Sequence, residues 1–165
     1  MSERAWIRGA QRGSVADLER LFREHWPRAY RAARLVTDDA AVAEDIAQEA
    51  FLAAVRNLDR FDRRRPFAPW LHRIVVNRAI DWTRARKLRA EIELADAVPA
   101  PPAPEVDGSM LGRIDELSPE HRAVIVLRYV LEYTPGEIAR LLELPRGTVN
   151  SRLRRGLDRL KELEA

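Results

Sequence analysis

Basic side chains are concentrated near the end of this sequence in a pattern that suits nucleic-acid binding. Between residues 146 and 161 the chain carries five arginines and one lysine but only one acid, Asp158. A guanidinium group donates paired hydrogen bonds to a phosphate, and in the major groove of DNA it binds guanine in the same bidentate way. The composition therefore indicates a helix that contacts DNA.

The residues before this basic segment predict the second helix of a helix-turn-helix. Thr134-Pro135-Gly136-Glu137 has the form of a capping box with proline at the first helical position, and Pro145 and Gly147 mark a tight turn. In such a motif the second helix enters the major groove. The candidate contacts are Arg146, Thr148, Asn150, Ser151, Arg152, Arg154 and Arg155. The alternative is a helical hairpin whose basic face is merely solvated.

A second basic segment precedes the middle of the chain and is interleaved with aromatic residues. Residues 56–89 hold 11 bases and three acids. The loop 59–67 contains Arg63, Arg64 and Arg65 and ends at Phe67, and bases with aromatics in this arrangement suit single-stranded or melted DNA. For Trp70 the better interpretation is a core residue, because it stands at a helix start beside Leu71. The loop arginines, taken alone, would be read as a solvated loop.

An acidic helix stands next to this basic segment. Residues 37–55 carry five acids and no base. Asp45 and Glu49 are spaced to share one helix face, which is more typical of a protein-docking surface than of a catalytic pair. His25, His72 and His121 are widely separated and the chain has no cysteine, so we expect neither a metal site nor a cofactor. The sequence also lacks a P-loop and any triad-like grouping.

Helical periodicity and a proline-rich break predict an all-α protein of two small domains, the C-terminal one a helix-turn-helix. Domain one is expected over 14–90, with helices from Ser14, over about 40–58 and over about 68–89, and with a kink or restart at Pro27. Residues 91–109 form an acidic Pro-rich linker, and domain two spans 110–163. No apolar run is long enough for a bilayer and the N-terminus lacks a signal-peptide core, so we expect a cytoplasmic protein without membrane insertion.

Two stretches of the sequence resemble a known family. AEDIAQEAFLAAVRNLDRF followed by RPFAPWLHRIVVNRAIDWTRARK resembles region 2 of a bacterial sigma factor, and LSPEHRAVIVLRYVLEYTPGEIARLLELPRGTVNSRLRR resembles region 4. A chain with only these regions is similar to the extracytoplasmic-function class. The resemblance departs at Asn150, where a lysine or arginine is common, and in the lead-in Thr134-Pro135-Gly136.

The resemblance implies a promoter-specificity subunit, not an enzyme. Its implied partners are the core of bacterial RNA polymerase, through the β′ clamp and β flap, promoter DNA and an anti-sigma factor. The implied residues for docking on the core are Asp45, Gln48, Glu49 and Phe51. Those for melting and reading the −10 element are Arg63, Arg64, Arg65, Phe67, Arg73, Asn77, Arg78 and Arg84, and the basic last helix would read the −35 element.

Two other classes remain open at this point. One is a regulator that binds duplex DNA as a dimer through 110–165, with 1–90 as a sensing or dimerising module. The other is a structural helical adaptor. The basic and aromatic segment at 59–89 argues against both, because neither a duplex-only regulator nor an adaptor needs it.

Overall fold

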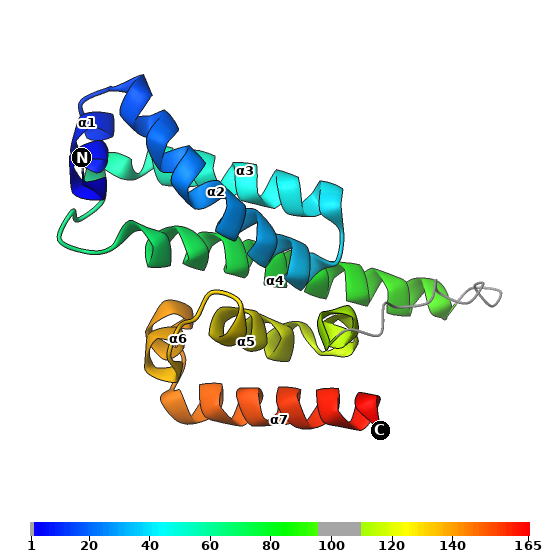
Figure 1. The fold of residues 1–165 in the computed structure, drawn as a ribbon. Helices are drawn as coiled ribbons and strands as arrows, with labels where there is room; N and C mark the ends of the chain where they lie inside the picture. The colour runs from blue at the N-terminus through cyan, green and yellow to red at the C-terminus, as the bar shows by residue number, and fades with distance from the viewer. Residues whose placement is uncertain (1, 96–109) are drawn as a thin grey trace.

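The computed structural model describes residues 2–95 and 110–165, and within them every regular element is a helix (Figure 1). The α-helices are α1 (Glu3–Gln11), α2 (Val15–Thr37), α3 (Ala40–Arg56), α4 (Phe67–Leu94), α5 (Pro119–Tyr129), α6 (Pro135–Leu142) and α7 (Arg146–Glu164). Two 3₁₀ helices, η1 (Leu58–Arg60) and η2 (Met110–Glu116), lie between them. The prediction of an all-α fold with two domains is confirmed. The proline-rich stretch 98–109 lies outside the described residues.

Side-chain caps start most of these helices where the sequence places a hydroxyl or a carboxylate. The side chains of Ser14, Asp39 and Ser118 each accept a hydrogen bond from the backbone amide three residues further on. Each bond satisfies one of the amides that a helix start leaves unpaired. The helix starts are therefore determined locally, by residues that can be read in the sequence.

The first domain packs α2 against α3 and α4 through small side chains. Ala29, Ala32, Ala43, Ala47 and Ala50 are all fully buried. Alanine at these positions lets the helix backbones approach closely, and the larger Leu21, Ile46, Leu71 and Val75 fill the remaining space. The inward positions predicted for α3 are all buried.

Three features of the first domain differ from the sequence prediction. Helix α1, which was not predicted, packs on α2 and buries Ile7. Helix α2 continues through Pro27 without a restart, because a proline removes only one helical hydrogen bond while Leu21 and Ala29 stay packed on either side of it. Helix α4 continues to Leu94, into the stretch predicted as linker.

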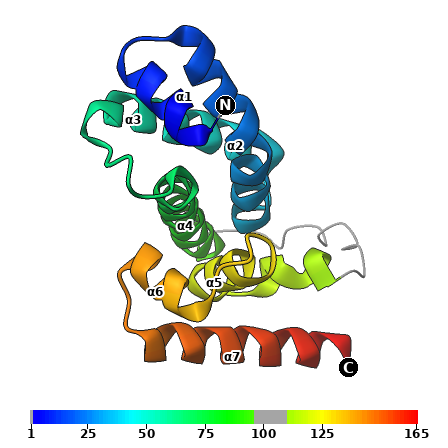
Figure 2. The ribbon, with the colours of Figure 1, turned by 60° about the vertical axis from the view of Figure 1, so that its left-hand side comes forward.

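The second domain consists of η2 and α5–α7 around a compact core that includes Leu127, Ile138 and Val149. Gly156 permits α7 to lie close to α5, since a Cβ atom there would stand 3.1 Å from Cγ1 of Ile125. Helices α5 and α6 lie against α2 and α4, whereas α7 is on the far side of the domain (Figure 2). Among the described residues, no helix combines the length and apolarity needed to cross a bilayer.

Candidate nucleic-acid interface

The basic face of α7 is accessible at the edge of the molecule (Figure 1). Val149, Leu153 and Leu160 anchor the helix in the core, as their spacing predicts. On the other face Arg146, Asn150, Arg154 and Arg155 are exposed, while Thr148, Ser151 and Arg152 are half-buried. The fold thus brings the predicted candidates of this segment to one helix and leaves their polar atoms within reach of a ligand.

The joint between α6 and α7 has the geometry of a helix-turn-helix. Thr134 accepts from the amide of Glu137 at 3.2 Å, and the Glu137 carboxylate accepts from the amide of Thr134 at 3.0 Å, which completes the capping box. Glu143 ends α6 in the left-handed region with φ 55°, and the amide of Leu144 donates to the carbonyl of Ala139 at 2.9 Å. No side chain caps the start of α7, which leaves that helix end suited to a phosphate.

The basic loop before α4 is exposed and is attached at its base to α1. Arg63, Arg64 and Arg65 are all exposed. Arg64 folds back onto Asp62, with 3.0 Å between Nε and Oδ1, and this hydrogen bond holds the pKa of the Asp62 carboxyl below its usual value. The side-chain amide of Gln11 donates to the carbonyls of Leu58 at 2.9 Å and Phe61 at 3.2 Å. The sequence contained no signal for this tether, because it joins segments about fifty residues apart.

Phe67 and Phe51 do not take the exposed positions predicted for them. Phe67 is 3% exposed and packs against His25, Phe61 and Trp70, so the expectation that it offers a stacking surface is corrected. Phe51 is 6% exposed and packs against Phe22. Both rings are large apolar groups at inward helical positions, and burial of such area outweighs any role at the surface. Trp70 is half-buried beside Phe61, as its core interpretation predicts.

The arginines of α4 that were predicted to face DNA are held by carboxylates. Arg78 lies 2.9 Å from Glu49 of α3. Arg73 lies 2.8 Å from Glu143, and Arg84 lies 2.5 Å from Glu120, both in the second domain. Asn77 is exposed between them. The structure therefore brings these residues to one side of α4 and places part of the second domain against the same side.

The acidic docking face of α3 adjoins an apolar groove that the sequence analysis missed. Asp45, Gln48 and Glu49 are exposed, as predicted. Beside them a groove of about 550 Å³ runs between α2 and α3, and it is lined by Val15, Leu18, Glu19, Phe22, Gln48, Phe51, Leu52 and Val55. Leu52 and Val55 fall off the inward positions of α3, and this was the sequence signal for an apolar surface.

Comparison with known proteins assigns both halves of the chain to one class. Residues 21–89 match the family model described as Sigma-70 region 2, and residues 108–160 match Sigma-70, region 4. The two regions, in this order and with the surfaces described above, define a bacterial transcription-initiation factor of the sigma-70 type.

Individual relatives narrow the assignment. ECF RNA polymerase sigma factor SigW of Bacillus subtilis is 32% identical, with 94% of this chain and 91% of the relative covered. RNA polymerase sigma factor CarQ of Myxococcus xanthus is 33% identical, with 92% and 91% covered. The solved structure of CnrH in complex with the cytosolic domain of CnrY superimposes with a TM-score of 0.74 at 29% identity, covering 98% of this chain and 96% of that one.

The chain belongs to the extracytoplasmic-function (ECF) family of RNA polymerase sigma factors. As a member of this family it directs RNA polymerase to promoters, and sigma factors as a class are not enzymes. The alternatives of a duplex-only regulator and of a structural adaptor are thereby set aside, because neither contains a region 2.

Proposed function

We propose that this sigma factor divides promoter recognition between its two domains. Helix α7 reads the −35 element, while the loop 59–67 and the exposed side of α4 read and melt the −10 element. The observation that carries this proposal is the accessible basic face of α7 at one edge of a molecule whose other domain exposes Arg63, Arg64 and Arg65. These are the surfaces that duplex and single-stranded DNA respectively require.

We infer further that α3 docks on the β′ clamp of the polymerase core. Asp45, Gln48 and Glu49 provide the polar part of this surface, and the groove between Phe22 and Leu52 provides the apolar part. A combination of an apolar centre and a charged rim is typical of a specific protein interface. Phe51 contributes to the floor of the groove rather than as a projecting contact.

The remaining partner and location proposals follow from membership of the family. CnrH was solved with the cytosolic domain of CnrY, and its fold matches this chain over nearly its whole length, so we propose that this chain also has an anti-sigma partner. Region 4 would contact the β flap of the polymerase. A protein that works on polymerase and chromosome is placed in the cytoplasm.

The test of the proposed function is transcription in vitro with bacterial core polymerase and a panel of promoters. Initiation at specific start sites, above that of core alone, is expected on at least one promoter. No added initiation on any promoter of the panel would contradict the proposal.

Replacing Arg155 and Arg152 separately should distinguish base reading from phosphate binding on α7. Arg155 is exposed, so Arg155→Ala is expected to cost about 1–3 kcal/mol and to relax preference at one −35 position. Arg152 is half-buried, and its charge contributes to the lowered pKa of His121 on α5, after the larger effect of burial. Arg152→Ala should therefore weaken all −35 sequences alike and flatten the salt slope. Binding of both variants to a matrix of −35 duplexes measures this, and identical sequence profiles would refute the division of labour.

A further inference from the structure

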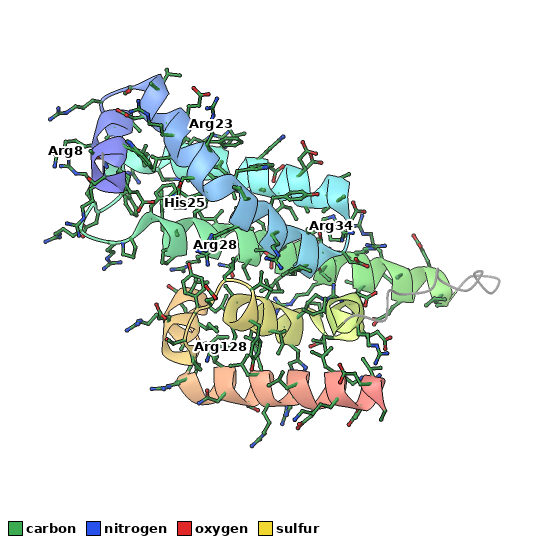
Figure 3. All side chains as sticks on the ribbon, viewed as in Figure 1. Arg8, Arg23, His25, Arg28, Arg34 and Arg128 are labelled. Atoms are coloured by element: carbon green, nitrogen blue, oxygen red, sulfur yellow. The ribbon has the colours of Figure 1, made fainter. Side chains whose placement is uncertain are left out.

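The second domain lies on the face of α4 that carries the proposed −10 contacts, and buried hydrogen bonds hold it there. Arg122 of α5 is 6% exposed, and its guanidinium donates to the carbonyl of Val36 at the end of α2, with 2.7 Å between the atoms. In the opposite direction Arg28 of α2 donates to the carbonyl of Leu131 at 3.0 Å (Figure 3). Each domain thus satisfies backbone carbonyls of the other, which a loose collision between two helical surfaces would not achieve.

A histidine–tyrosine pair lies between these two arginines. Nδ1 of His72 on α4 is 2.7 Å from the hydroxyl oxygen of Tyr133, in the segment that joins α5 to α6. His72 is 1% exposed and Tyr133 9% exposed, and their rings meet edge to face. Such a pair combines apolar burial with a directional hydrogen bond, so it fixes the register of the two domains as well as their contact.

Two ion pairs at the margins of this contact use residues that the proposed function assigns to DNA. Glu143 at the end of α6 pairs with Arg73, and Glu120 in the first turn of α5 pairs with Arg84. A phosphate and a carboxylate bind the same guanidinium donors, so they exclude one another. The basic face of α7, by contrast, points away from α4 and remains accessible (Figure 2).

We propose that the second domain is an intramolecular inhibitor of the first: in the free protein, region 4 covers part of the −10-reading side of α4, and the domains must separate before a melted −10 strand can bind there. We call the contact made by Arg28, Arg122, His72, Tyr133 and the two marginal ion pairs the interdomain seam. The proposal rests on the proposed function for its statement of what is covered. It adds that −35 recognition and −10 recognition are unequally available in the free protein.

The seam sets the apparent affinity for a −10 strand through the population of the open state. A ligand that binds only the open state has an apparent dissociation constant equal to the intrinsic constant divided by the open fraction. An open fraction between about one in ten and one in a hundred would therefore weaken −10 binding by about 10- to 100-fold. Duplex −35 DNA, which contacts α7, would be bound by closed and open forms alike.

The test reverses the two acids of the seam that are outside the proposed DNA contacts. In the full chain, Glu120→Lys with Glu143→Lys places lysines opposite Arg84 and Arg73 and should open the seam. Because the natural sequence has no cysteine, Arg56→Cys and Lys161→Cys can carry a dye pair, one dye on each domain. Energy transfer should be high in the parent and fall in the reversed variant. A single-stranded −10 probe should bind the reversed variant at least 10-fold more tightly than the parent.

A matched control separates opening from simple gain of positive charge. Glu132→Lys with Glu164→Lys makes the same change in net charge at two exposed acids, and it should leave energy transfer unchanged and raise affinity for matched and scrambled probes equally. If the reversed variant gives the same transfer as the parent, or binds the −10 probe no better than the control, the inhibitory seam is refuted. Initiation by the parent with core polymerase, measured on the same preparation, reports the proposed function and can succeed while this inference fails.

Acid should open the seam through His72. Burial, followed by the positive charges of Arg28 and His25 on α2, lowers the pKa of His72 to about 4 from a model value of 6.5. Besides these two groups it faces Tyr133 of the second domain, and its buried Nε2 has no hydrogen-bond partner, so an added proton would find no acceptor. The closed state is thus fully favoured above pH 6.5 and loses that advantage as pH falls toward 4.

Energy transfer measured against pH checks this expectation. For a histidine with these two pKa values, the ratio of open to closed forms should rise by about 30-fold between pH 7.5 and pH 5. The His72→Gln variant keeps a polar group beside Tyr133 but does not titrate, and its response over the same range should be at least 10-fold smaller. Equal responses of the parent and this variant would assign any acid opening to another group.

Discussion

Simultaneous reversal of Asp45 and Glu49 to lysine is expected to weaken binding to core polymerase by about 3 kcal/mol, or on the order of 100-fold at low salt. Both side chains are exposed on α3 beside the apolar groove. Reversal removes two attractions to a basic partner surface and replaces them with like-charge repulsion. The loss should shrink as salt is raised, because exposed charges are screened over a Debye length. Titration of labelled core polymerase at two salt concentrations measures the effect.

The control for this variant is Glu91→Lys with Glu93→Lys, which makes the same charge change at exposed positions near the end of α4. Its core affinity should stay within about twofold of the parent. Glu49 also pairs with Arg78, with side chains 62% and 41% exposed, so the reversal has only a minor effect on folding. Thermal unfolding of both variants should confirm this. Unchanged core affinity of the Asp45 and Glu49 reversal at low salt would refute docking through this face.

Truncation of Ile138 to alanine is expected to destabilise the helix-turn-helix by about 2–5 kcal/mol. Ile138 is 0% exposed on α6, where it holds the short helix against the core of the second domain. A loss of this size is a large fraction of the stability of a small domain. Binding of −35 duplexes should therefore collapse on warming, whereas docking on core polymerase through α3 should be retained. Urea unfolding followed by circular dichroism, together with duplex binding, measures both effects.

Arg140→Ala is the matched control on the same helix. Arg140 is exposed, so its truncation should change stability by less than about 0.5 kcal/mol. If Ile138→Ala unfolded no more readily than Arg140→Ala, the packing described for α6 would be wrong. Loss of core docking together with loss of −35 binding would show instead that the two domains unfold as one unit.

The helices of this protein were largely predictable because their signals are local. The start of α6 was visible in Thr134-Pro135-Gly136-Glu137, and the buried face of α7 in the spacing of Val149 and Leu153. Capping and helical periodicity act over fewer than ten residues, so no knowledge of the rest of the fold is needed to read them. The family was recognisable for the same reason, since its motifs are continuous stretches of chain.

The errors concern residues whose role depends on what lies next to them. Phe67 was assigned to the surface from its position beside the arginine run, but it packs on His25 and Trp70. Leu52 and Val55 became meaningful only when α2 supplied Phe22 as the other wall of a groove. The tether from Gln11 to the basic loop likewise joins residues that only folding brings together.

By itself, then, the sequence determined the all-α architecture, the helix-turn-helix, the segregation of acidic and basic surfaces and the family. The tertiary structure alone decided which residues of those surfaces are accessible and that region 4 lies against region 2. Contacts such as Arg122 with Val36 and His72 with Tyr133 join segments more than sixty residues apart. Their formation depends on the shapes of two finished surfaces, and neither helical periodicity nor composition carries that information.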